Sequence, residues 1–186
     1  MIPAHRNHEF SRIYLWGFMG SGKSTIGQEL AQRLSYEFVD LDCSIEKIEN
    51  LKVAEIFSQK GEEYFRKIEH ETLKTVARRT DKVIVSAGGG TPCHFDNAKI
   101  MNETGVTIYL EVSPKSLKRR LKNEDRDARP LLMNLTWKEI IDLYQNRLEF
   151  YKTAQITVSN DQNITKCLQA IMEQLDQLQF VPNKLL

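Results

Sequence analysis

Cysteines, long apolar runs and an excess of charge of one sign are all scarce or missing in this chain. Only three of its 186 residues are cysteines, and Cys43, Cys93 and Cys167 are widely spaced, without a Cys-x-x-Cys pair. An odd and sparse set of this kind argues against a disulfide framework and is typical of reduced thiols inside a cell. We therefore expect a cytoplasmic protein.

No apolar run approaches the ~20 residues that a helix needs to cross a bilayer. The first eleven residues are polar and lack the apolar core of a signal peptide, so we interpret residues 1–11 as an N-terminal extension. The formal net charge is only +1, and nothing in the overall balance favours a nucleic acid or an anionic membrane as a partner. We expect neither to bind.

The composition, 41% hydrophobic and 27% charged, is that of a globular protein long enough to bury a core. Apolar runs rich in β-branched residues alternate with amphipathic stretches along the chain. The strands are expected near residues 13–16, 37–41, 82–87, 107–112 and 155–158. The helices are expected near residues 23–34, 43–50, 61–79, 95–103, 114–121, 136–151 and 163–178. This alternation predicts an α/β fold, a single domain over residues 12–180 with a mostly parallel sheet covered on both faces.

Residues 17–24, Gly-Phe-Met-Gly-Ser-Gly-Lys-Ser, match GxxxxGK[ST] between a predicted strand and a predicted helix. In that context the match predicts a phosphate-binding loop rather than a glycine-rich turn that matches by chance. Glycines let backbone N–H groups converge on phosphate oxygens, and the following helix adds the partial positive charge of its N-terminus. Lys23 can reach the β- and γ-phosphates, and the Ser24 hydroxyl can hold Mg²⁺. The predicted nucleoside triphosphate site consists of Gly20, Ser21, Gly22, Lys23, Ser24 and Thr25.

Two carboxylates mark the end of the second predicted strand. Side chains alternate along a strand, so Asp40 and Asp42 are expected on one face, with Leu41 turned away. One could hold Mg²⁺ through a water and the other could accept a proton from a substrate hydroxyl. The alternative is that Asp42 only caps the helix that follows.

The third predicted strand ends in three glycines, Gly88, Gly89 and Gly90. Three consecutive glycines cost conformational entropy, and close approach of the backbone to a ligand would justify that cost. A tight turn between strand and helix is the alternative. No acidic residue stands at this strand end, where a Walker B aspartate would lie, so Asp40 is expected to do that work.

Arg66 and Arg147 both lie in charged helical patterns. Taken alone, Arg66 is typical of a solvated helix face, paired with Glu62 or Glu69 one turn away. Arg147 likewise looks like an ordinary helix arginine. The residues themselves therefore leave a functional and a structural interpretation open for both.

Residues 123–135 carry Pro130, are strongly charged and show no clear period. A loop of this length in a compact domain is typically functional and often forms a lid. An arginine brought in by a closing lid can neutralise charge on a transferred phosphoryl group, and Arg129 is our candidate. Arg126 lies nearby among acidic neighbours and is the alternative.

Taken together, these segments resemble shikimate kinase from about residue 13 to residue 158. The matching pieces are residues 17–24, Asp40-Leu-Asp42, Ile56-Phe57 with Gly61-Glu62, Phe65-Arg66 with Glu69, Gly88-Gly-Gly90, Arg129-Pro-Leu-Leu132, and Arg147 with Tyr151. A phosphate loop alone is shared by very many proteins. The motifs DxD, FRxxE, GGG and RPLL in this order are far more restrictive.

The resemblance implies a P-loop fold of the nucleoside-monophosphate-kinase type, a five-stranded parallel sheet flanked by helices. It also implies a mobile lid over ATP near residues 123–135 and a substrate-binding segment near residues 43–71. The implied reaction transfers the γ-phosphoryl group of Mg·ATP to the 3-hydroxyl of shikimate, in the pathway to chorismate and aromatic amino acids. A monomer is implied as well.

In that family the residue matching Asp42 bonds the acceptor hydroxyl, while Lys23 and the lid arginine Arg129 meet the phosphates. The arginines matching Arg66 and Arg147 grip the substrate carboxylate, which suits two guanidinium groups that can each bond it through two hydrogen bonds. The other residues implied at the acceptor are Gly88, Gly89 and Gly90, with Glu69 orienting Arg66 and with Phe57 and Phe65 lining the pocket.

This chain departs from the family at Lys122 and Gln162, where some members carry arginines that contact adenine. Gluconate kinase is the nearest alternative, because gluconate is also a polyhydroxylated acid. An adenylate-type kinase fits the glycine triplet poorly. A regulatory nucleotide-binding module with a degenerate acceptor site is the alternative from a different class of protein.

Overall fold

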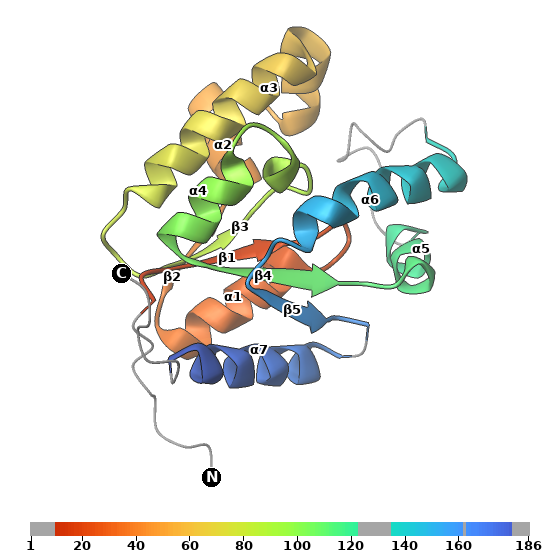
Figure 1. The fold of residues 1–186 in the computed structure, drawn as a ribbon. Coiled ribbons are helices and arrows are strands. Elements are labelled where there is room, and N and C mark those ends of the chain that lie inside the picture. Colours follow the sequence, from red (N-terminus) through yellow and green to blue (C-terminus); the bar gives the residue numbers. More distant parts are fainter. Residues whose placement is uncertain (1–9, 123–134, 162, 180–186) are drawn as a thin grey trace.

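The computed structural model describes residues 10–122, 135–161 and 163–179, and in these ranges a central sheet carries helices on both faces (Figure 1). The strands are β1 (Arg12–Trp16), β2 (Glu37–Asp40), β3 (Val83–Ser86), β4 (Val106–Glu111) and β5 (Ile156–Ser159). The helices are α1 (Lys23–Leu34), α2 (Leu41–Glu49), α3 (Val53–Ala77), α4 (Asn97–Thr104), α5 (Pro114–Lys122), α6 (Trp137–Tyr151) and α7 (Ile164–Gln179). A short 3-10 helix, η1 (Thr91–Cys93), follows β3.

The five strands form one parallel sheet in the order β2-β3-β1-β4-β5, which confirms the predicted five-stranded parallel sheet. The register pairs Leu15 of β1 and Asp40 of β2 with the same residue of β3, Ser86. The carboxyl ends of these three strands therefore lie level. The phosphate loop, the two aspartates and the glycine triplet all follow them, so the topology brings these motifs to one edge of the sheet.

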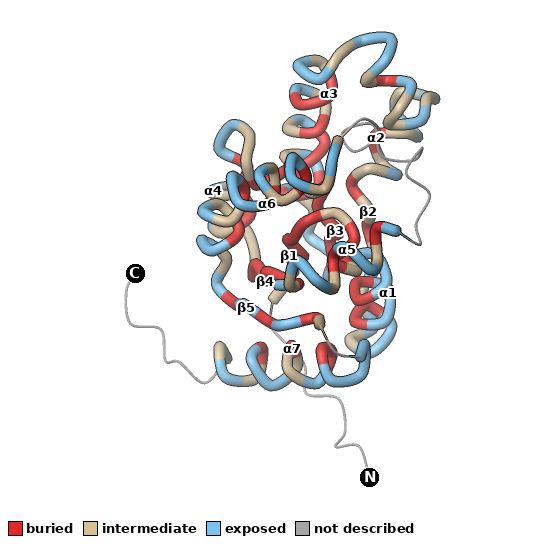
Figure 2. The backbone as a smooth tube through the Cα atoms, turned by 90° about the vertical axis from the view of Figure 1, so that its right-hand side faces the viewer, coloured by how far each residue is buried: buried red, intermediate tan, exposed pale blue. Residues whose placement is uncertain are grey.

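Side chains of the central strands point alternately to the two faces of the sheet and pack in two separate hydrophobic cores. Ile13 and Leu15 of β1 pack with α1 and α7, whereas Tyr14 and Trp16 pack with α2, α3 and α4 on the opposite face. Burial on both faces explains why these strands read as continuous apolar runs. Figure 2 shows the buried strands between helices whose outer sides are exposed. A third cluster joins residues of β4, α5 and α6 and includes Tyr109, Tyr144 and Tyr151.

Two predicted boundaries are wrong in an informative way. The sequence predicts a helix from residue 61, but α3 begins at Val53 and continues through a kink at Gly61, whose φ is 82°. Glycine tolerates this left-handed conformation, so the chain resumes its helix beyond the kink. The short helical segment before Gly61 was missed because its apolar period is brief. Strand β2 ends at Asp40 and α2 starts at Leu41, so Asp42 lies on a helix rather than on a strand.

Candidate active site

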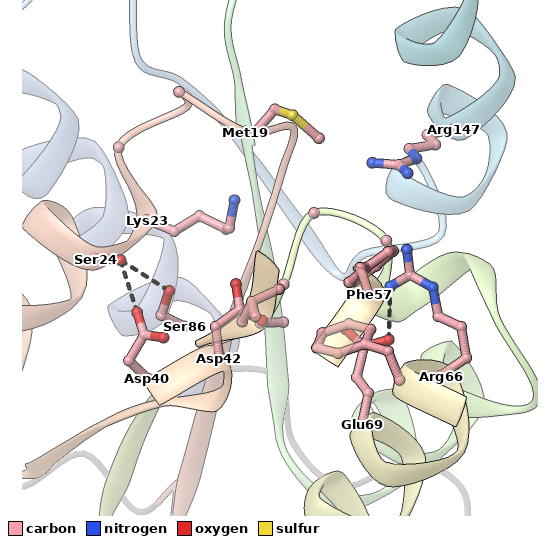
Figure 3. Close-up of a pocket in the computed structure, with 18 of the residues that line it drawn as sticks. Met19, Lys23, Ser24, Asp40, Asp42, Phe57, Arg66, Glu69, Ser86 and Arg147 are labelled. Atoms are coloured by element: carbon pink, nitrogen blue, oxygen red, sulfur yellow. Dashed lines mark hydrogen bonds and ion pairs between the residues drawn. The ribbon is translucent and has the colours of Figure 1, made fainter. Parts of the chain in front are cut away.

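A cavity of about 260 Å³ opens at the carboxyl ends of β1, β2 and β3. Its lining combines Lys23 from α1, Asp42 from α2, Arg66 from α3, Gly89 from the loop after β3, and Arg147 from α6. Figure 3 shows the side chains of Lys23 and Asp42 on one side of this space and those of Arg66 and Arg147 on the other. Residues separated by more than a hundred positions in the sequence thus meet in one pocket.

The phosphate loop has the backbone that its glycines predict. Gly17, Gly20 and Gly22 have φ values of 146°, 78° and 89°, in a region that L side chains rarely adopt. The Lys23 ammonium donates to the carbonyl oxygens of Gly17 at 2.8 Å and Phe18 at 3.1 Å. Lys23 therefore lies across the mouth of the loop, beside the N-terminus of α1, where an anion is favoured.

The outer carbonyls of the same loop are held by two residues that the sequence did not single out. Nη1 of Arg120 on α5 donates to Gly20 O at 3.2 Å and Ser21 O at 3.3 Å. Nδ2 of Asn160, directly after β5, donates to Ser21 O at 2.7 Å, and Arg120 Nη2 donates to Asn160 O. In the sequence, the one indication of this role is that Asn160 follows a predicted parallel strand, and nothing comparable marks Arg120.

Ser24, Asp40 and Ser86 form an oxygen-rich corner next to the loop (Figure 3). Ser24 Oγ donates to Asp40 Oδ2 at 2.8 Å and lies 3.4 Å from Ser86 Oγ. The other oxygen of Asp40 accepts a bond from Cys43 N at 3.2 Å and so caps α2. The helix cap is thus Asp40, whereas the sequence had left that role open for Asp42. Ser86 was not anticipated, although it stands where a Walker B aspartate would be expected.

Asp42 lines the cavity from the first turn of α2, close to Asp40. Desolvation raises the pKa of Asp42 to about 7, and the charges of Glu69 and Asp40 act in the same direction. The positive charges of Lys23 and Arg66 oppose that rise. A carboxyl with a pKa near neutrality is suited to accept a proton during catalysis.

Arg66 is only 5% exposed, although its sequence pattern suggested a solvated helix face. Both carboxylates proposed as partners bond it: Nη1 donates to Glu69 Oε2 and Nη2 donates to Glu62 Oε1, each at 2.9 Å. Glu69 is fully buried, and its second oxygen accepts a 2.6 Å bond from Thr91 Oγ1. The rings of Phe57 and Phe65 also line the cavity beside this guanidinium.

Arg147 is 6% exposed, and its Nη1 atom is buried without a hydrogen-bond partner in the part of the chain that the structure describes. Figure 3 shows its guanidinium pointing from α6 toward the cavity. Leaving a buried charged donor unpaired costs free energy, and an anionic ligand would remove that cost. Arg147 thus presents to the cavity a donor atom that has no partner among the described residues.

The glycine triplet is needed for space rather than for an unusual backbone conformation, since none of the three has a positive φ. A Cβ on Gly90 would lie 2.8 Å from Nη1 and Nη2 of Arg66. A Cβ on Gly88 would lie 2.8 Å from Glu69 Oε1. The absence of side chains lets the Arg66–Glu69 pair approach the backbone at the edge of the cavity.

Some predicted site residues cannot be placed against this geometry. Arg129, Arg126 and Pro130 belong to residues 123–134, outside the described residues, and so does Gln162. Lys122 is the exposed last residue of α5, and Thr25 is exposed in the first turn of α1 beside the cavity.

Comparison of the sequence with known proteins finds the shikimate kinase family. The profile of the shikimate kinase family matches residues 19–177. The shikimate kinase of Parabacteroides distasonis is 41% identical over 159 residues, which cover 83% of this chain and 91% of the relative. That of Phocaeicola vulgatus is 43% identical over 149 residues, covering 78% of this chain and 84% of the relative.

Solved structures agree with this result. The shikimate kinase of Bacteroides thetaiotaomicron superimposes with a TM-score of 0.82 at 37% identity, covering 90% of this chain and 99% of the other. The enzyme from Acinetobacter baumannii, solved in complex with shikimate, gives 0.87 at 28% identity and covers 93% and 97%. A gluconokinase from Sinorhizobium meliloti gives 0.59 at 17% identity, which shows a shared fold alone.

Proposed function

The chain belongs to the shikimate kinase family, and we propose from its site how it transfers the γ-phosphoryl group of ATP to shikimate. One observation carries the proposal: the phosphate loop with Lys23 and Arg147, whose buried Nη1 atom has no partner among the described residues, border the same cavity. A kinase for a small acidic acceptor needs both features within reach of one substrate. The products are shikimate 3-phosphate and ADP.

At the acceptor end, Arg147 and Arg66 bind the carboxylate of shikimate. Two fixed guanidinium groups hold a planar carboxylate in one orientation better than a lysine could. Glu69 bonds Arg66 and is itself bonded by Thr91, which keeps the guanidinium in place. Phe57 and Phe65, which contact each other, pack against the ring of shikimate. Gly88, Gly89 and Gly90 bring backbone groups to the same substrate.

Asp42 lies between these arginines and the phosphate loop. It accepts a hydrogen bond from the 3-hydroxyl of shikimate and takes up its proton as the phosphoryl group arrives. The pKa of about 7 makes this exchange favourable near neutral pH. Lys23 and the loop N–H groups, with Arg129 from the lid, stabilise charge on the phosphoryl oxygens.

Ser24 and Asp40 are the residues that we propose for Mg²⁺. A hydroxyl and a carboxylate are oxygen donors of the kind that this ion prefers, and they lie 2.8 Å apart beside Lys23. A donor set of this chemistry fits the ion. When bound, Mg²⁺ would neutralise part of the phosphate charge.

We further propose that residues 12–180 form one domain, with residues 1–11 as an extension, and that the protein is a cytoplasmic monomer without a nucleic-acid or membrane partner. Free thiols at Cys43, Cys93 and Cys167 support an intracellular location. No helix in the described ranges is long and apolar enough to span a bilayer.

The direct test is ATP consumption with shikimate and with gluconate in parallel, each measured against a blank without acceptor. We expect ADP release with shikimate alone. Release with gluconate alone would keep the kinase chemistry but overturn the acceptor. Binding of ATP without turnover on either acceptor would instead favour a regulatory module.

A further inference from the structure

The three carbonyl groups of the glycine triplet are all held by donors. Gly88 O accepts from Thr91 N at 3.1 Å and Gly90 O accepts from Cys93 N at 2.9 Å, both within the turn of η1. Gly89 O accepts a 2.5 Å bond from the hydroxyl of Tyr151, which lies 62 residues further along the chain. The middle carbonyl is therefore the one whose direction depends on another element, α6.

Tyr151 is rigidly placed to make this bond. Its side chain is fully buried and its ring stacks on Tyr109, with ring centres 5.2 Å apart and an angle of 26° between the planes. Burial raises the pKa of the Tyr151 phenol, and the nearby charge of Arg147 offsets only part of that rise. The hydroxyl thus stays protonated and remains a donor at any pH at which the enzyme would work.

Tyr151 also lies four residues after Arg147, which places both side chains on one face of α6. One helix face thereby holds the Arg147 guanidinium, whose Nη1 atom has no partner among the described residues, and the donor that restrains Gly89. A Cβ on Gly89 would lie 3.5 Å from Arg147 Nη1, so the arginine and the triplet backbone are in near contact.

We propose that Tyr151 is a positioning residue for the carboxylate of the acceptor, a role that rests on the proposed function. Its hydroxyl turns the Gly89 carbonyl away from the bound anion and ties α6 to the triplet. In a trans peptide the C=O and N–H groups point in opposite directions, so this bond also sets the direction of the Gly90 N–H. Glycines restrict their own backbone least, and a triplet needs such an outside restraint.

The consequence of losing the hydroxyl follows from electrostatics. A released Gly89 carbonyl can rotate toward the cavity and present its partial negative charge to the carboxylate of shikimate. Arg147 would lose the Tyr151 hydroxyl as a polar neighbour. Acceptor binding suffers, whereas ATP binding at the phosphate loop does not.

The test is Tyr151→Phe, which removes one oxygen and keeps the stacked ring. We expect the KM for shikimate to rise about tenfold, as for loss of one buried hydrogen bond, with the KM for ATP unchanged. Tyr144→Phe is the matched control, because Tyr144 lies in the same cluster and bonds Tyr109 and the carbonyl of Val112 instead. It should leave both KM values unchanged.

Three outcomes separate the possibilities. Equal KM values in Tyr151→Phe and wild type, or a parallel rise for both substrates that Tyr144→Phe shares, would overturn the positioning role. Wild-type protein that does not turn over shikimate would instead overturn the proposed function. If Tyr151→Phe is too unstable to assay, shikimate is titrated into wild-type protein carrying ¹³C-labelled tyrosine. The Tyr151 ring signal should shift at saturation while the Tyr144 signal stays, and an unmoved Tyr151 signal would contradict the proposal.

Discussion

Asp42 stands between two other carboxylates, Asp40 and Glu69, and both raise its pKa beyond what desolvation alone does. Each of these neighbours also has a structural role of its own, since Asp40 caps α2 and Glu69 holds Arg66. The raised pKa of the proposed base thus depends in part on two carboxylates that also shape the pocket. A single substitution at either neighbour changes both geometry and proton affinity.

The pH dependence of turnover follows from this arrangement. A base must be ionised to accept a proton, so kcat/KM for shikimate, which follows the pKa of the free enzyme, should fall about tenfold per pH unit once the pH drops below about 7. Because the folded chain binds this proton more tightly than the unfolded chain, the same group lowers the free energy of unfolding as the pH rises toward 7. A pH profile of kcat/KM measures the first effect. Glu69→Gln should move the acidic limb to lower pH in whatever activity remains, and an unmoved limb would contradict the assignment.

At the scale of elements, α5 and the end of β5 hold the phosphate loop from outside. Arg120 and Asn160 take up the carbonyls of Gly20 and Ser21, and the N–H of Ser21 donates to Phe18 O at 3.0 Å within the loop. Helix α5 is thereby bonded directly to the phosphate loop.

We therefore expect Asn160→Ala to raise the KM for ATP about five- to tenfold, because a buried bond to Ser21 O is lost. The KM for shikimate should stay near its wild-type value. Steady-state kinetics with each substrate varied in turn will measure both. Arg119→Ala, at the exposed neighbour of Arg120 on α5, is the matched control for surface effects near this helix. An ATP KM as low as in wild type would show that the loop holds its shape without Asn160.

The segment 123–135 contributes the proposed lid arginine. Arg129→Ala should lower kcat about a thousandfold if the residue stabilises transition-state charge as an arginine finger does. Single-turnover measurements at saturating ATP and shikimate would separate this effect from weaker binding. Turnover equal to that of wild type would transfer the role to Arg126, and Arg126→Ala is the paired variant.

For the molecule as a whole, substrate binding should be visible as stability. The buried Arg147 Nη1 atom has no partner in the described ranges, which costs free energy that the proposed acceptor carboxylate would recover. At a concentration of one hundred times its Kd, shikimate should add about 2.7 kcal/mol to the free energy of unfolding. For a domain of this size we expect a rise in Tm of about 5–10 °C.

Thermal unfolding with and without shikimate provides that measurement. Arg147→Ala should lose most of the rise, because the carboxylate then lacks one of its two anchors. The same variant should keep the stabilisation by ATP, for which we propose the phosphate loop at the other end of the cavity. A full response to shikimate in Arg147→Ala would remove this residue from the acceptor site.

The fold class and the phosphate loop could be predicted from local patterns of residues. Period and spacing are local properties, so alternating strands and helices, and a glycine-rich loop between Trp16 and Thr25, could be predicted from short stretches. The family resemblance extended this to the acceptor residues, because several rare motifs occur in one order. The residues alone, however, left Arg66 and Arg147 as ordinary helix arginines.

The burial of these side chains and the groups that they contact depend on the packing of the folded chain. Arg66 is enclosed between Glu62 and Glu69, whereas Arg147 Nη1 has no partner in the ranges that the structure describes. The packing also introduces Arg120, Asn160 and Tyr151, which bond the two glycine-rich loops from distant elements. Burial and long-range contact depend on how whole helices pack on a sheet, and no local pattern records them. The motifs therefore predict the chemistry of the two glycine-rich loops, whereas the shape of these loops depends on residues far away in the chain.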